Sequence, residues 1–201
     1  MNISFRQYRA IDLTIMLVIL AAAEAVIVTA AKFWFPGELY VLSPTITIVC
    51  IVMMRWGGFA AIHAVAGGLA MCIASGASTE QYVIYCVGNC AALIALLWFR
   101  FLGKEKVRSK VLFTALFTLT AFCAEQVGRW LVALIFGGTA GNIFGFFASD
   151  SLSLIFAILV VQLTRRLDGV FEDQKTYLLR IQAEQKRREA EAEYGEDPGN
   201  Y

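Results

Sequence analysis

Long apolar runs alternate with short polar or glycine-rich connections along most of the chain. A helix needs about 20 residues to cross about 30 Å of hydrocarbon, and six runs approach or exceed this length. The pattern therefore predicts an all-α, polytopic membrane protein built as a six-transmembrane-helix bundle. The runs fall at about 12–33, 40–54, 57–75, 82–102, 111–136 and 143–164, and only "RWGG" separates the second from the third, which predicts a tight hairpin.

Composition supports the membrane assignment. Hydrophobic residues make up 59% of the 201 positions and charged residues only 16%, against about 25% in soluble domains. The sequence lacks the basic stripe that is typical of nucleic-acid-binding proteins. The five cysteines lie inside apolar runs, without a CxxC motif or a histidine at metal-ligand spacing, so we expect reduced packing residues and no metal site.

Positively charged connections stay on the cytoplasmic side of a membrane. Ten Lys and Arg residues lie before the first run, between the second and third, between the fourth and fifth, or just after the sixth, and Lys32 alone falls on the other side. The sequence thus predicts a multi-pass protein of the cell (plasma) membrane with cytoplasmic N- and C-termini. The ten residues are Arg6, Arg9, Arg55, Arg100, Lys104, Lys106, Arg108, Lys110, Arg165 and Arg166.

Charged residues become dense after the sixth run. We therefore divide the chain into a transmembrane domain, 1–166, and a cytoplasmic tail, 167–201. The tail favours a helix with a thin apolar set, Phe171, Leu178 and Ile181, and its last residues, "GEDPGNY", are expected to be disordered. It is either a solvated juxtamembrane helix or a docking or membrane-surface helix.

Polar residues gather at one depth inside the predicted bundle. In "AFCAEQVGRW" (121–130), Glu125 and Arg129 lie about 20 and 27 Å above the start of their helix, in its outer half. The same estimate gives a similar depth for polar residues of three other helices: Glu24, Asn89 and Asp150.

Each such group is costly inside a membrane, at about 2.5 to 3.5 kcal/mol for a charged residue at a helix centre, unless it is paired or faces water. Glu125 and Arg129 are i,i+4 neighbours that can pair, with Asp150 or Glu24 as competing partners. Arg129 would also suit a carboxylate, a phosphate or a planar ring. Aromatic walls with a few polar groups are typical of a small-molecule site, and the candidate substrate-binding residues are Glu24, Trp34, Tyr85, Asn89, Glu125, Gln126, Arg129, Trp130, Phe146 and Asp150.

A structural role for the same residues stays open. Polar groups also hold membrane bundles together, and Trp and Tyr near helix ends often anchor the membrane interface. We expect His63 to be packed and hydrogen-bonded. Small residues at Ala60, Ala64 and Gly68, and at Gly88 and Ala92, predict permanent close contacts between helices.

Between about residues 10 and 166 the chain resembles a known family. The likeness lies in six predicted helices with both ends inside, in an AxxxA pattern at Ala21 and Ala25, and in the stretch "SPTITIVCIVMMRWGGFAAIHAVAGGLAMCIASG" (43–76). There a short apolar helix, a glycine-rich turn and a small-residue helix follow one another. On these features the chain resembles the S components of energy-coupling factor (ECF) transporters, the membrane subunits that capture vitamins and related micronutrients.

The resemblance implies a function and partners. Such a subunit binds its solute in a cup open to the outside and then topples onto an ECF transmembrane coupling subunit driven by two cytoplasmic ATPases. Ala21 and Ala25 would form the partner-docking surface, although Glu24 interrupts that small-residue segment. No motif identifies the vitamin.

Other functions are also considered. The chain contains no phosphate-binding loop, HExxH motif, serine triad order or paired metal ligands, so we expect neither an enzyme nor a cofactor. The alternative to solute capture is a non-transporting membrane scaffold that acts through its cytoplasmic tail. A stand-alone secondary transporter is less favoured, because neither an inverted repeat nor a pair of broken helices is evident.

Overall fold

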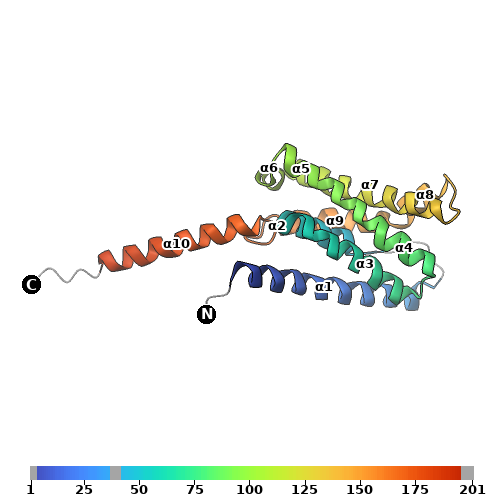
Figure 1. Cartoon of the computed structure of the whole chain (residues 1–201), viewed down its shortest axis with the longest axis horizontal. Helices are drawn as coiled ribbons and strands as arrows, with labels where there is room; N and C mark the ends of the chain where they lie inside the picture. The colour runs from blue at the N-terminus through green and yellow to red at the C-terminus, as the bar shows by residue number, and fades with distance from the viewer. Residues whose placement is uncertain (1–3, 37–41, 196–201) are drawn as a thin grey trace, which may run out of the picture.

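The computed structural model of the chain describes residues 4–36 and 42–195, and every regular element in this part is helical, as predicted. The helices form one elongated bundle, from which the last helix projects (Figure 1). In chain order they are α1 (Phe5–Trp34), α2 (Thr45–Trp56), η1 (Gly57–Phe59), α3 (Ala60–Ser75), α4 (Thr79–Gly88), η2 (Asn89–Leu96), α5 (Leu97–Phe101), α6 (Lys104–Ser109), α7 (Val111–Ile135), α8 (Asn142–Ser149), α9 (Ser151–Thr164) and α10 (Gln174–Gly195).

Several of these helices have the length and composition of membrane spans, which is compatible with the predicted membrane protein. Within the described ranges, four continuous helical stretches are long and apolar enough, and a pair bent by 45° makes a fifth. They are Phe5–Trp34, Thr45–Ser75, Thr79–Phe101, Val111–Ile135 and the bent pair of α8 and α9.

The second of these stretches is folded back on itself at Gly57, whose φ is 64°. A Cβ atom placed on Gly67, in α3, would lie 2.2 Å from Oγ1 of Thr45 at the start of α2. Only the predicted hairpin brings these two positions together. Helix α2 has 12 residues, or about 18 Å at 1.5 Å per residue, so it cannot cross about 30 Å of hydrocarbon alone. The predicted second span, 40–54, therefore contains a half-length helix that starts at Thr45. Positions 40 and 41 of that predicted span lie outside the described residues.

The chain passes between two ends of the bundle. At the terminal end α1 begins, α6 lies and α10 departs, whereas the distal end carries the turns after α3 and after α7 (Figure 1). Towards the terminal end, Nε2 of His63 lies 3.0 Å from the carbonyl oxygen of Leu13, which confirms the hydrogen-bonded role expected for this histidine. At the distal end, Nζ of Lys32 donates to the carbonyl oxygen of Ser75 at 2.6 Å.

Small residues allow the helices to approach closely, as predicted. Ala60 and Ala64 of α3 are fully buried. A Cβ on Gly68 would lie 2.8 Å from the backbone of Tyr85, and one on Gly88 would lie 2.6 Å from Cα of Arg129. These are close contacts within the bundle, between α3 and α4 and between α4 and α7.

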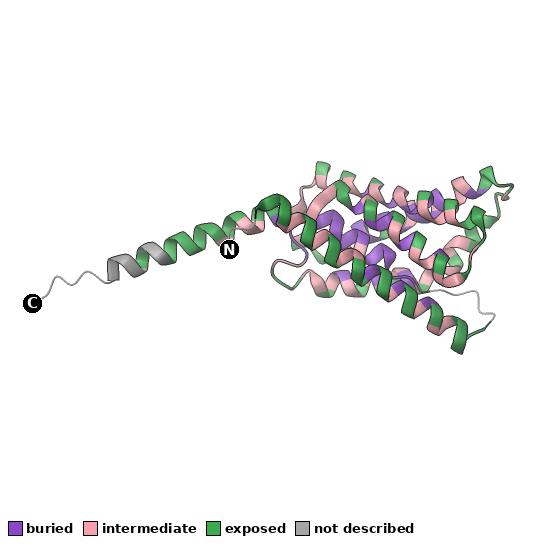
Figure 2. Cartoon of the chain, turned by 60° about the horizontal axis from the view of Figure 1, so that its bottom comes forward, coloured by how far each residue is buried: buried purple, intermediate pink, exposed green. Residues whose placement is uncertain are grey.

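Burial differs sharply between the helices. Most residues of α2 are buried in the centre of the bundle, whereas the described residues of α10 after Gln174 are exposed or half-buried (Figure 2). Helix α1 buries only Leu20, Glu24 and Val28, and their spacing of four residues defines a single inward stripe. Leu13 and Met16 are partly buried against the core, and most other residues of α1 are exposed.

The segment between α9 and α10 is anchored to the terminal end. Phe171 is fully buried, with its ring centroid 6.5 Å from that of Phe117 on α7. Lys104 of α6 pairs with Asp173, which also caps α10 by accepting from the backbone N–H of Thr176 at 3.1 Å. Burial pushes the pKa of the Asp173 carboxyl up, but the bonds from Lys104 and Thr176 outweigh it and hold this pKa below its ordinary value. The bundle therefore continues a few residues past position 166.

Candidate functional site

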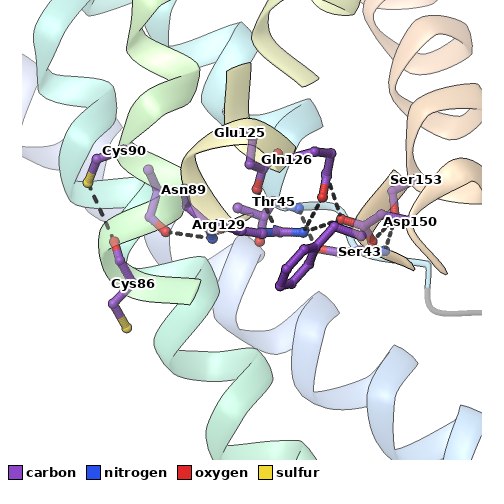
Figure 3. A network of polar contacts seen from close by, with 12 residues as sticks. Ser43, Thr45, Cys86, Asn89, Cys90, Glu125, Gln126, Arg129, Asp150 and Ser153 are labelled. Carbon is purple, nitrogen blue, oxygen red and sulfur yellow. Dashed lines mark hydrogen bonds and ion pairs between the residues drawn. The ribbon is translucent and has the colours of Figure 1, made fainter. Parts of the chain in front are cut away.

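Arg129 of α7 is the centre of a buried polar network in the distal half of the bundle (Figure 3). Its Nη2 donates to Oε1 of Glu125 at 2.6 Å, and its Nη1 donates to the Asp150 carboxylate. Its Nε donates to Oδ1 of Asn89 at 2.7 Å. Gln126 bridges the group, because its Oε1 accepts from Nη1 at 3.2 Å and its Nε2 donates to Oδ2 of Asp150 at 3.1 Å. The predicted shared depth and the Glu125–Arg129 pair are thus confirmed.

Hydroxyl groups extend this network to α1. Oγ of Ser153 donates to Oδ1 of Asp150 at 3.0 Å and accepts from the backbone N–H of Ser43 at 2.8 Å. Oγ of Ser43 donates to Oε1 of Glu24, and Oγ1 of Thr45 donates to the same oxygen at 2.5 Å. All the polar residues predicted at this depth therefore belong to one connected group.

Local chain geometry places two of these residues. Asp150 lies at the 45° bend between α8 and α9, where its carboxylate meets the positive end of the α9 dipole. Asn89 begins η2, a 3₁₀ stretch of 8 residues that interrupts the passage from α4 to α5. Runs of this length are uncommon and often mark a functional or strained position. The Asn89 side chain also donates to the carbonyl oxygen of Ala64 at 3.1 Å, which ties η2 to α3.

Arg129 is enclosed by protein groups within the part of the chain that the structure describes. The residue is 2% exposed, and each of its three side-chain nitrogens donates to a protein acceptor. The donors of Arg129 are used by protein acceptors in this arrangement, and the expectation that Arg129 suits a solute carboxylate, phosphate or planar ring stays a prediction. A solute would reach Arg129 only if the network opened.

Two aromatic rings lie between Arg129 and the distal pockets. The guanidinium carbon of Arg129 is 4.8 Å from the centroid of the Tyr85 ring, a cation–π contact. The Tyr85 ring packs edge-on against Phe146 of α8, with centroids 6.5 Å apart and planes at 74°. Tyr85 thus contacts the network and the pocket residue Phe146 at once.

The open space lies beyond these rings. Two pockets, of about 340 Å³ and 520 Å³, adjoin at the distal end and are both lined by Tyr85, Asn142 and Phe146. Each volume falls in the range of small-molecule sites. Glu80 of α4 lines the smaller pocket, and Ser149 of α8 lines the larger one. Aromatic walls with a few polar groups are therefore found at these two pockets.

Two predicted site residues lie outside both the network and the two distal pockets. Trp34 is 68% exposed at the end of α1, and its aromatic neighbour there is Phe33. Its position near a helix end fits the interface-anchoring role that was left open for Trp residues. Nε1 of Trp130 donates to the carbonyl oxygen of Thr139 at 3.3 Å, in the turn that follows α7. Trp130 therefore supports the distal turn.

The predicted docking pair lies on one surface. Ala21 and Ala25 are both exposed, while Glu24, between them in sequence, is turned into the bundle and is 0% exposed. The interruption that Glu24 introduces in the sequence is therefore absent from the outer face of α1. A small-residue surface is left free there for lipid or another helix.

Sequence reasoning missed the residues that connect the network. Ser43, Thr45 and Ser153 link Glu24 to Asp150, but small hydroxyl residues in apolar runs give no distinctive spacing. The sequence "SPT" at 43–45 offered one signal, since Ser and Pro commonly stand at a helix start.

Comparisons with known proteins identify no relative: no family model, no curated protein and no solved structure matches the chain. Within residues 4–36 and 42–195, no group of three or more His, Cys, Asp or Glu side chains is placed to hold a metal ion.

Proposed function

We propose that this chain is the substrate-capture subunit of an ATP-driven ECF-type importer, and that it binds a vitamin or related micronutrient at its distal end. The observation that carries the proposal is the pair of distal pockets that share Tyr85 and Phe146 directly above the Arg129 network. A rigid, charge-paired base beneath an aromatic pocket is a suitable arrangement for a preorganised binding site.

Charge distribution supports the orientation that this function needs. The Lys and Arg residues gather at the terminal end, where Arg55, Lys104 and Arg108 form ion pairs, and Lys32 lies at the distal end. By the positive-inside rule the terminal end is cytoplasmic. The pockets then open to the outside of the cell membrane, and both termini lie in the cytoplasm. In this proposal the six apolar runs form the transmembrane bundle, with α2 as a half-length member.

The outer face of α1 is suited to contact a helix of a partner protein. Ala21 and Ala25 are exposed beside each other on this face, and small residues allow close approach of another helix. We assign this surface to the ECF coupling subunit, with two cytoplasmic ATPases supplying the energy.

The first experiment compares two phenylalanines of α8. Phe146 lines both pockets, while Phe144 on the same helix is 79% exposed and lines neither. Small molecules that copurify with the detergent-solubilised protein are identified by mass spectrometry, and the affinity for the identified compound is measured by calorimetry. Phe146→Ala should weaken binding at least about tenfold, because an aromatic side chain that a bound solute covers contributes about 1.5 to 3 kcal/mol. Phe144→Ala should bind normally.

Equal binding by the two variants would exclude the distal pockets as the site. A protein that carries no compound and binds none of a panel of micronutrients would remove the capture function itself. The scaffold alternative would then gain weight, since α10 projects from the terminal end on a base anchored by Phe171 and by ion pairs of Glu172 with Arg108 and Arg180.

A further inference from the structure

The distal network contains more negative than positive side chains. Glu24, Glu125 and Asp150 meet a single guanidinium, that of Arg129. If all three acids were ionised, three negative charges against one positive charge would leave a net charge of −2 in a buried group. Arg129 is bonded to Glu125 and Asp150, so each of these two carboxylates is directly paired with the guanidinium. Glu24 is bonded only to hydroxyl groups, those of Ser43 and Thr45.

A second observation singles out Glu24. Its side chain is 0% exposed, and its Oε2 has no hydrogen-bond partner among the described residues. An ionised carboxylate oxygen that is buried without a donor is among the most costly arrangements in a protein interior. A protonated carboxyl group is neutral, and a neutral group is far less costly to bury.

The groups around Glu24 do not supply the missing positive charge. Arg129 attracts negative charge on Glu24, whereas Asp150 and Glu125 repel it. The N-terminus of α2 would also favour an anion, but the N–H of Thr45 already donates to Oγ of Ser43 at 3.2 Å. The other charged or titratable side chains on α1 and on the helices packed against it are Arg6, Tyr8, Arg9, Asp12 and Lys32 of α1, Cys50 and Arg55 of α2, and His63 and Cys72 of α3. Arg6, Tyr8 and Arg9 lie at least about 22 Å along α1 from Glu24.

None of these side chains neutralises Glu24. Arg55 is engaged by Asp12 at 2.6 Å, about 18 Å along α1 from Glu24. Lys32 is bonded to the C-terminal carbonyl oxygens of α3, about 12 Å along α1 in the other direction. His63 is bonded beside Leu13, nearer the terminal end. The negative charge on Glu24 must therefore be neutralised by a bound species smaller than a side chain, namely a proton or a metal ion.

A proton fits this position better than a metal ion. A metal ion needs several oxygen lone pairs directed at it, but Ser43 and Thr45 point their hydroxyl hydrogens at Oε1 of Glu24. We propose that Glu24 is a proton-binding site and holds a proton in the folded protein at neutral pH. This inference is independent of the identity of the solute and of the importer assignment.

Infrared spectroscopy of the full-length protein in detergent tests the site directly. At neutral pH the protein should show the carbonyl stretching band of a protonated carboxyl group, shifted in D₂O. Glu24→Gln should remove this band, because the amide has the same shape and no proton to lose. Glu105→Gln, at an exposed acid of α6 away from the distal pockets, is the matched control and should leave the band intact.

Two further variants keep the test decisive. Ser43→Ala should raise the frequency of the band, because the Glu24 carbonyl loses a hydrogen-bond donor; this result holds even if Glu24→Gln fails to fold. A band that is absent from the unaltered protein, that is unmoved in Ser43→Ala, or that disappears in Glu125→Gln and persists in Glu24→Gln would overturn the assignment. A midpoint of thermal unfolding that rises specifically with sodium concentration and falls to the level of Glu24→Gln without sodium would also overturn it, in favour of a metal cation.

Discussion

Arg129 illustrates how a charged residue is kept inside an apolar bundle. It is bonded to two carboxylates and to the amides of Asn89 and Gln126. Removing one partner of a buried ion pair leaves the other as an uncompensated charge, which costs about 3 to 5 kcal/mol. We therefore expect Arg129→Ala to lower the free energy of unfolding by about this amount, as measured by chemical denaturation in detergent.

The control and the rescue separate this effect from a general sensitivity to arginine loss. Arg187 pairs with Glu191 on the exposed face of α10, where ion pairs contribute little, so Arg187→Ala should leave the unfolding midpoint unchanged. Adding Glu125→Gln and Asp150→Asn to Arg129→Ala should restore part of the lost stability, because no net charge then stays buried. A stable single variant that gains nothing from the added changes would contradict the account.

At the residue scale, spacing and depth predicted a good part of the site. The i,i+4 relation of Glu125 and Arg129 and the equal depths of Asn89 and Asp150 follow from helix geometry alone. The serine and threonine links could not be found in this way, because a hydroxyl group is readily tolerated in an apolar run and signals no partner. Whether Arg129 faces a solute or the protein was equally hidden, since that depends on helix rotation.

At the element scale, the crossing of α4 and α7 depends on two glycines. A Cβ on Gly128 would lie 2.4 Å from Cβ of Ala91 and 2.5 Å from the carbonyl oxygen of Gly88. Gly128→Ala should therefore push the helices apart and move the neighbouring Arg129 away from Asn89. We expect a loss of about 1 to 3 kcal/mol in the free energy of unfolding, typical of an overpacked core.

Another helical glycine provides the matched control. A Cβ on Gly145, in α8, would meet nothing within 4 Å, and alanine is a better helix former than glycine by about 1 kcal/mol. Gly145→Ala should leave stability unchanged or raise it slightly in the same denaturation assay. If Gly128→Ala behaved in the same way, the close approach of α4 and α7 would not be needed for the fold.

Helix boundaries were harder to predict than helix existence. The apolar pattern indicated the hairpin of α2 and α3 correctly, because "RWGG" leaves no room for another connection. The length of α2 was overestimated, since Tyr40, Val41 and Leu42 extend the apolar run in the sequence although Pro44 already marks the helix start. Hydropathy reports whether a segment is buried and cannot tell a full crossing from a half-length helix inside the bundle.

At the scale of the whole molecule, the question is where the folded bundle ends. The jump in charge density after position 166 predicted a boundary there. A charged stretch does not reveal that one aromatic residue within it is inserted into the core. Phe171 is fully buried against Phe117, and Gln174, also buried, accepts from the hydroxyl of Tyr8 at 3.1 Å. These contacts tie the segment after α9 to both α7 and α1.

Truncation tests this placement of the boundary. A chain that ends after Gln182 keeps Phe171, Gln174 and the pair of Glu172 with Arg180, so it should unfold at the same denaturant concentration as the full chain. A chain that ends after Arg166 exposes the cavity that Phe171 fills, and a loss of about 3 to 5 kcal/mol is expected for removal of a buried Phe. Phe171→Ala should reproduce most of this loss within the full-length protein, whereas Leu179→Ala, at a position 58% exposed on α10, should not.

If both truncated chains were as stable as the full chain, the segment would be an appendage and the bundle would end at 166. If only the longer one is stable, the terminal end is closed by residues that the charge pattern assigns to the tail, and any partner at this end meets a surface made jointly by α1, α6 and that segment.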